Sequence, residues 1–225
     1  MFLTEAQMTE IFTLSDAKKE MLHNTTISQE GPGTILTDFQ TFLDFVAEGM
    51  PLSAKHYMPT KVLDALNQRM AIPYKHKLRR ALQKSYPYLN GLYLLARSSG
   101  LTIVDGSGKK ATLVFNEPIH DSWQKLNQTE RYFTLLETWL LRSSPKIIGE
   151  DSRGVFSNPW YGLQLLFRQI PDEGLSAEAG ASLADEFTYG PGLYSLASTD
   201  LFGLISLQSG EPPERLNIQI PSGRR

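Results

Sequence analysis

Basic side chains are concentrated in one stretch of the sequence, residues 66–110. This stretch holds nine lysine and arginine residues and one acid, Asp105, for a net charge of +8. The whole chain has a net charge of −2, so the remaining residues sum to −10. Clustered cations that neutralise several phosphates give a salt-dependent affinity for nucleic acid. We therefore expect a nucleic-acid-binding surface made of Lys75, Lys77, Arg79, Arg80, Lys84, Arg97, Lys109 and Lys110.

Two of these lysines fall in a predicted turn between short strands. The segments "LTIVD" and "ATLVF" alternate apolar and polar residues, and "DGSGKK" between them supplies two glycines for a tight turn. The alternation predicts one common face for Leu101, Ile103, Leu113 and Phe115. Lys109 and Lys110 would then stand at the tip of a β-hairpin, where they can contact phosphate.

A third helix should precede this hairpin, with Leu89, Leu92, Tyr93 and Ala96 in its core-facing positions. A helix followed by a hairpin is the order found at the end of a winged helix, where the third helix usually enters the major groove. Here that helix, "YLNGLYLLARSSG", is apolar on nearly every side. Only Asn90, Arg97 and Ser98 offer groups to a base edge. The sequence thus predicts weak contact with the backbone of duplex DNA, without strong sequence specificity.

No pattern in the sequence requires catalysis. "GSGKK" lacks the spacing of a phosphate-binding loop and lies between two expected strands. Glu117, His120 and Asp121 carry metal-binding atoms, but the four histidines form no H-x-x-x-H pair, so we interpret His120 and Asp121 as a helix cap. No G-x-S-x-G element is present. We expect a non-catalytic protein with no catalytic residues, no metal site and no cofactor.

The rest of the chain is expected to be mainly helical. Helices are predicted over residues 4–23 and 38–48, and another begins at Pro59 and Thr60 and is stopped by Pro73. Asn127 can cap a further helix with Glu130, three residues on. That helix should present a broad apolar face: Tyr132, Phe133, Leu135, Leu136, Trp139 and Leu140. The polar residues 24–33, which end in Gly-Pro-Gly, indicate a linker, and residues 143–154 indicate a domain boundary.

An internal repeat bears on the domain organisation. Residues 91–96, "GLYLLA", recur 101 positions later as "GLYSLA", with five of six residues identical. Each copy is followed by a Gly-Leu strand candidate, "GLTIV" or "GLISL", a turn and a second strand. Coincidence in a leucine-rich chain is one interpretation, and the shared context favours the other, two tandem units. We predict a mostly helical α+β fold with an N-terminal helix and linker (1–33) and two winged-helix-like units (34–142 and 155–225).

Four segments carry a resemblance to a known family: "GTILTDFQTFLDFV", "MPTKVLDALNQRM", "QKSYPYLNGLYLLARSSGLTIVDGSGKKATLVF" and "SWQKLNQTERYFTLLETWLL". Over roughly residues 34–150, the chain resembles the region that precedes the defining domain in the Ri-plasmid open-reading-frame-three family. This resemblance implies a bacterial, plasmid-borne or mobile-element-associated winged-helix protein. The family's defining domain is expected beyond Arg225, so none of its functional residues are carried over.

Two functions follow from these observations. The first is a DNA-associated accessory or regulatory protein that binds duplex backbone through the basic surface. The second is a winged-helix adaptor that binds another protein or a second copy of itself, in which the basic run is only a solvated surface. The absence of cysteine fits a reducing compartment, and no window approaches the roughly 18 apolar residues of a membrane span. We expect a cytoplasmic protein with no membrane partner.

Overall fold

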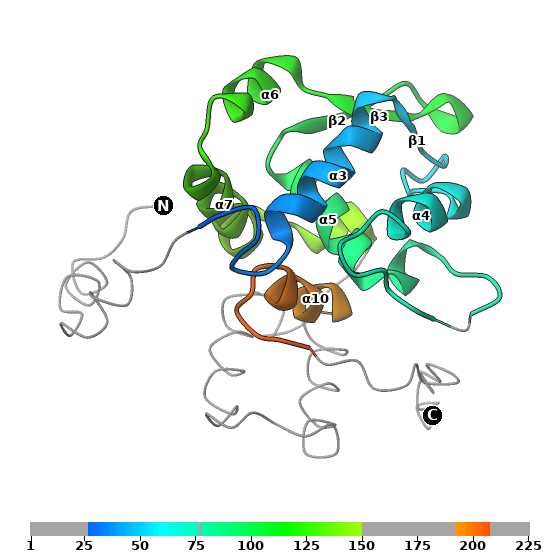
Figure 1. The fold of residues 1–225 in the computed structure, drawn as a ribbon. Coiled ribbons are helices and arrows are strands. Elements are labelled where there is room, and N and C mark those ends of the chain that lie inside the picture. The colour runs from blue at the N-terminus through cyan, green and yellow to red at the C-terminus, as the bar shows by residue number, and fades with distance from the viewer. Residues whose placement is uncertain (1–26, 77, 150–191, 208–225) are drawn as a thin grey trace, which may run out of the picture.

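The computed structural model describes residues 27–76, 78–149 and 192–207 (Figure 1). These residues form a mixed α+β fold in which helices predominate. Its helices and strands are α3 (Ile35–Ala47), β1 (Met50–Pro51), α4 (Thr60–Asn67), α5 (Pro87–Ser98), β2 (Thr102–Asp105), β3 (Thr112–Phe115), α6 (Glu117–Gln124), α7 (Gln128–Glu137) and α10 (Leu193–Leu201). Shorter helical turns are η1 (Gln83–Ser85), η2 (Gly108–Lys110), η3 (Thr138–Arg142) and η4 (Pro145–Ile148). None of the described helices is long and apolar enough to cross a membrane.

The three strands form one antiparallel sheet in the order β1-β3-β2. The predicted hairpin is confirmed, with Ile103 opposite Val114 and Asp105 opposite Thr112. The predicted faces are wrong in one position, because Ile103 is 46% exposed while Thr102 is buried. Leu101 is buried too, but it precedes the first paired residue, so its burial does not follow the alternation of the strand.

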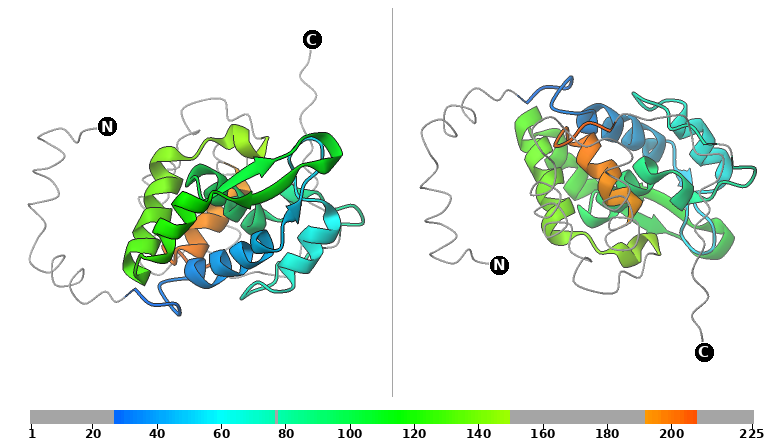
Figure 2. Two further views of the ribbon diagram at one scale, coloured as in Figure 1. Left: turned by 90° about the horizontal axis from the view of Figure 1, so that it is seen from above. Right: turned by 90° about the horizontal axis from the view of Figure 1, so that it is seen from below.

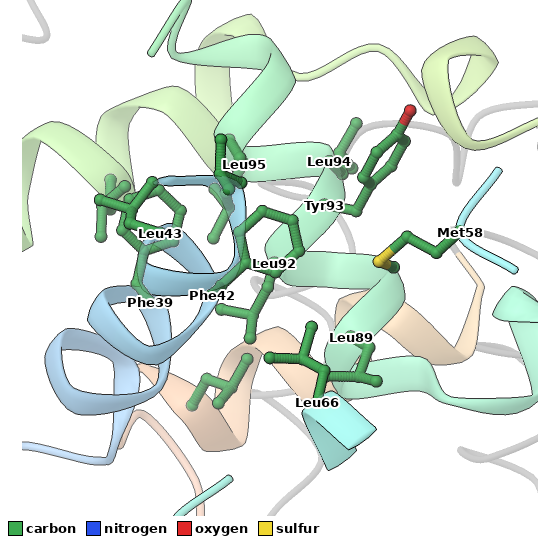
Figure 3. Packing of buried hydrophobic residues seen from close by; sticks show 14 of the residues in the cluster. Phe39, Phe42, Leu43, Met58, Leu66, Leu89, Leu92, Tyr93, Leu94 and Leu95 are labelled. Atoms are coloured by element: carbon green, nitrogen blue, oxygen red, sulfur yellow. The ribbon is translucent and has the colours of Figure 1, made fainter. Parts of the chain in front are cut away.

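Helix α5 is the centre of the core. Leu89, Leu92, Tyr93 and Ala96 are fully buried, as their spacing predicted. Helices α3, α4 and α10 contact α5, as do η3 and η4. In the close-up, Leu66 of α4 lies beside Leu89 (Figure 3). Aliphatic burial of this kind contributes about 1.5–3 kcal/mol per side chain, so α5 anchors the fold.

Helix α10 lies on α5, on the side away from the hairpin. Viewed from above the hairpin is in front, and viewed from below α10 is in front (Figure 2). Gly91 permits this approach, since a Cβ there would lie 3.0 Å from the Ser198 hydroxyl oxygen. The Tyr88 hydroxyl donates a hydrogen bond to Asp200 across the same interface, at 2.8 Å. The two copies of the repeated hexamer therefore lie in contacting helices of a single core.

The strand predicted for "GLISL", residues 203–207, is wrong: residues 203–205 form a turn and a bend, and residues 206–207 are irregular. The chain folds back on α10 instead, because the Leu204 amide donates to the Thr199 carbonyl at 2.9 Å. The Leu207 amide likewise donates to the Asp200 carboxylate at 3.0 Å. Within residues 155–225, only residues 192–207 are described. The second winged-helix-like unit therefore stays a prediction.

The described end of the predicted linker is packed against the core, so that prediction is wrong for residues 27–33. Ile27 is buried, and Ser28 and Gly31 form an isolated β-bridge. Gly33 lies against the backbone of Leu201 and Gly203, where a side chain has no room. The predicted N-terminal helix, residues 4–23, lies outside the described residues.

Local signals set several helix ends. The predicted capping box of α7 is confirmed: the Glu130 amide donates to the Asn127 side chain at 2.9 Å, and the Asn127 amide donates to the Glu130 carboxylate at 2.8 Å. Helix α4 follows Pro59 as predicted but ends at Asn67, before Pro73. The side chain of Asn67 ends it by pairing with the backbone N–H and carbonyl of Tyr74, both at 3.0 Å.

The apolar face predicted for α7 is confirmed in part. Tyr132 and Leu135 are buried, as is Trp139 in η3. Phe133 was expected on the same face and is 52% exposed, so that expectation is wrong. On a helix of 3.6 residues per turn, Phe133 follows Tyr132 by about 100° and turns away from the core.

Candidate nucleic-acid interface

The segment between α4 and α5, residues 69–84, has no acidic residue, and we call it the basic segment. Apart from η1, the described residues of this segment have no regular secondary structure. The Asp38 carboxylate, buried in α3, accepts a hydrogen bond from the Ala71 amide at 2.7 Å and fixes the start of the segment. Four of its predicted phosphate-binding residues are exposed: Lys75, Arg79, Arg80 and Lys84. Lys77 lies outside the described residues.

The hairpin tip carries the other two predicted lysines. Lys109 and Lys110 are exposed in η2, the single turn between β2 and β3. Gly106 makes the tight turn possible, because its φ is +73° and a Cβ there would lie 2.7 Å from the Lys110 carbonyl oxygen. The tip therefore presents two adjacent cations beyond the end of the sheet.

The loop after β1, residues 52–59, joins these two basic regions. At one end the Leu52 amide donates to the carbonyl of Ala111 in the hairpin, at 2.8 Å. At the other end the Met58 amide donates to the Gln83 side chain at 2.8 Å. The hairpin tip and the basic segment consequently lie on either side of α4, as Figure 1 shows.

This loop and the helix after it add two exposed lysines that sequence reasoning missed, Lys55 and Lys61. The Thr60 hydroxyl, next to Lys61, donates to the Ala81 carbonyl at 3.4 Å, which brings the start of α4 against the basic segment. Both lysines lie outside the stretch of residues 66–110 whose charge drew attention. The one sequence feature that could have pointed to Lys55 and Lys61 is their position on either side of Pro59, after which a helix was predicted to begin.

Within the described residues, the cations of this surface have no acidic partners. Among the described residues a single ion pair is present, between Arg142 and Glu137 at 2.7 Å, and it lies elsewhere. The two acids nearest in sequence are engaged otherwise: Asp64 accepts from the Tyr86 hydroxyl, and Asp105 accepts from the Gly106 amide. An array of exposed, unpaired cations attracts polyanions and leaves its charge available to them.

Arg97 occupies a different environment from the other predicted residues. Its guanidinium donates to the Tyr93 hydroxyl at 3.1 Å and lies 5.8 Å from the centre of that ring. The Tyr93 hydroxyl in turn donates to the carbonyl of His56, in the loop after β1. Burial raises the pKa of the Tyr93 hydroxyl, and the neighbouring Arg97 only partly offsets this. Arg97 thus lies beside the basic surface in a partly buried, cation–π arrangement.

Helix α5 has no free face with which to enter a groove. Nine of its twelve residues are buried. The expectation that Asn90 can meet a base edge is wrong, because Asn90 is buried and accepts a hydrogen bond from the Gln83 side chain at 2.8 Å. The Ser98 hydroxyl oxygen is buried as well. Direct readout needs side chains that project from the helix into the major groove, and α5 does not offer them.

The group of possible metal ligands lies on α6. The ligand atoms of Glu117, His120 and Asp121 are within 4.8 Å of one another. The prediction that His120 and Asp121 cap a helix is wrong, because α6 begins at Glu117 after Asn116. The His120 ring stacks on Phe115 with ring centres 3.9 Å apart, and its Nε2 lies 3.0 Å from the Gln124 amide nitrogen. The contacts with Phe115 and Gln124 give the His120 imidazole a structural role.

Comparison with known proteins adds no relative to this description: no family model, no curated protein and no solved structure matches the chain. The resemblance to the Ri-plasmid open-reading-frame-three family therefore stays a prediction.

Proposed function

We propose that the chain binds the phosphate backbone of duplex DNA as a non-catalytic accessory or regulatory protein. The observation that carries the proposal is the set of exposed cations around the loop of residues 52–59, which have no acidic partners in the described part of the chain. We call this set the basic band: Lys55, Lys61, Lys75, Arg79, Arg80, Lys84, Lys109 and Lys110. Arg97 lies beside the band. Lys77 lies outside the described residues, and we assign it to the band from its place in the sequence.

The order of the elements supports a winged-helix-like unit over residues 34–142. A helix, a short strand, two helices and a hairpin follow one another as α3, β1, α4, α5 and β2–β3, and the strands pair in the order β1-β3-β2. In such a unit the hairpin is the wing, which touches the flanking backbone. We expect Lys109 and Lys110, which are exposed at the tip, to make that contact.

The burial of α5 determines the kind of binding that we propose. Contacts to phosphate position a protein on DNA but carry no sequence information, which comes from base edges. Since α5 is buried in the core, the basic band contributes charge and little direct readout. The affinity should be modest and should change little from one duplex sequence to another.

The salt dependence of the affinity tests the proposal. The dissociation constant of the full chain for a random-sequence duplex is measured by fluorescence anisotropy between about 20 and 200 mM salt. Each phosphate neutralised contributes about −0.9 to the slope of log K against log salt, so a band of eight cations gives a slope of up to about −7. Absence of binding at the lowest salt, or a slope near zero, would overturn the proposal.

A further inference from the structure

The basic segment also exposes aliphatic side chains that neither the fold nor a phosphate backbone uses. Ile72 is 74% exposed, Leu82 61% and Leu78 39%. The described part of the chain has eight large exposed apolar side chains, and three of them lie within the eleven positions from 72 to 82. These three side chains lie close together in the sequence and alternate with cations, so they offer apolar contact points to a partner.

The fold does not require these three side chains. The segment is held in place by buried Met70 and Ala81 and by backbone hydrogen bonds to the side chains of Asp38 and Asn67. Ile72, Leu78 and Leu82 nevertheless leave 74%, 39% and 61% of their surface exposed, and aliphatic surface in contact with water is unfavourable. An occupant that covers them would remove that cost.

We propose that the basic segment docks an acidic, amphipathic segment of a partner protein. The segment has cations and no acid, so the occupant must carry carboxylates. Its exposed aliphatic groups call for apolar side chains between those carboxylates, as on an amphipathic helix laid on a surface. Aspartate or glutamate alternating with leucine or phenylalanine satisfies both requirements.

A membrane surface fits less well than a peptide. Loops that insert into an anionic bilayer usually present aromatic side chains at the interface. The rings of this segment face the protein instead: Tyr74 packs against Tyr88, with ring centres 5.9 Å apart, and His76 packs edge-on against Tyr86 at 4.7 Å. The exposed apolar groups are aliphatic and scattered between cations, an arrangement that suits a peptide.

This inference does not rest on the DNA-binding proposal. Both proposals use the cations of the basic segment, but this inference depends in addition on the exposed aliphatic side chains, which the DNA-binding proposal does not use. The two ligands would share the cations of the basic segment, so an acidic partner should displace DNA. Protein binding at this site would then regulate the DNA-binding activity.

Anisotropy titrations of the full chain with two labelled peptides test the inference. One is a 20-residue amphipathic peptide that combines glutamate with leucine, and the other is a polyglutamate peptide of equal charge. We expect the amphipathic peptide to bind at least about tenfold more tightly, since burying one aliphatic side chain accounts for that factor. Ile72→Ser/Leu82→Ser should abolish this difference and leave the affinity for polyglutamate and for duplex DNA unchanged.

Leu141→Ser is the matched control, because Leu141 is 61% exposed, as Leu82 is, and lies outside the basic segment. It should leave both peptide affinities unchanged, and thermal melts should verify that every variant folds. Equal affinities for the two peptides, an equal loss in the control, or binding to phosphatidylserine vesicles in preference to the amphipathic peptide would each overturn the inference. Peptide binding without duplex binding would overturn only the DNA-binding proposal.

Discussion

Gly33 and Gly203 lie with their backbones in direct contact, although 170 positions separate them in the chain. A Cβ on Gly203 would be 2.4 Å from the Gly33 amide nitrogen, and one on Gly33 would be 2.1 Å from the Leu201 carbonyl oxygen. Both glycines have positive φ, +65° and +67°. The turn before α3 and the turn after α10 therefore form one unit, which fixes α10 on the core.

Substitution of either glycine should destabilise the fold. Gly203→Ala adds a Cβ where backbone atoms already lie and forces alanine into the left-handed region, so we expect a loss of about 2–5 kcal/mol in the free energy of unfolding. Urea denaturation measures it. Gly108→Ala is the control, since Gly108 has φ +58° but no atom within 4 Å of its Cβ position, and it should lose only about 1 kcal/mol. Similar losses of unfolding free energy in Gly203→Ala and Gly108→Ala would contradict the close contact between the backbones of Gly33 and Gly203.

Asn90→Ala should lower stability without changing DNA recognition. The substitution leaves the Gln83 amide nitrogen buried without its acceptor, which costs about 1–3 kcal/mol. Gln68→Ala, at an exposed position after α4, is the control and should change stability little. If Asn90 reads a base, the variant would instead change the relative affinities for duplexes of different sequence while its denaturation midpoint stays that of the native chain.

Asp38 should make stability depend on pH in the acidic range. Burial raises the pKa of its carboxyl above 3.8, and the hydrogen bond from Ala71 only partly opposes that rise. The folded chain then holds the proton more tightly than the unfolded chain, so this contribution to stability is full below pH 3.8 and is lost as the pH rises through the raised pKa. Asp38→Asn removes the titration while keeping an acceptor for Ala71.

The unfolding free energy of the Asp38→Asn variant minus that of the native chain should therefore rise with pH across this window and then level off. The total rise of this difference is about 1.4 kcal/mol for each unit by which the pKa is raised. Urea denaturation between pH 3 and pH 8 measures it. A difference that is constant or falls with pH would contradict the raised pKa.

Short-range patterns in the sequence predicted the local structure well. The Asn127–Glu130 capping box forms with both of its hydrogen bonds, and the glycines around Ser107 form the hairpin turn. Each of these features depends on residues within a few positions of one another. Ile103 was predicted on the wrong face because it was grouped with Leu101, which precedes the paired strand; within β2, Thr102 and Val104 are the residues opposite Phe115 and Leu113.

Long-range contacts could not be predicted in the same way. The repeated hexamer gave no sign that its two copies would lie in contacting helices, an arrangement that Gly91 permits by allowing α10 to approach α5. Lys55 and Lys61 join the candidate site through hydrogen bonds from Met58 and Thr60 to residues more than twenty positions away. Neither the contact between α5 and α10 nor the hydrogen bonds of Met58 and Thr60 produce a periodicity or a spacing that can be recognised in a single sequence.

The two lysines of the hairpin tip should contribute separately to DNA binding. Lys109 and Lys110 are exposed and unpaired, so each alanine substitution should flatten the slope of log K against log salt by about 0.9, and the double substitution by about 1.8. Stability should not change, since neither side chain is buried. Lys125→Ala is the matched control: it removes one exposed positive charge at the end of α6, outside the basic band, and should leave the slope unchanged. Equal flattening by Lys125→Ala and Lys110→Ala would mean that the overall charge of the chain, and not contact at the hairpin tip, determines the affinity.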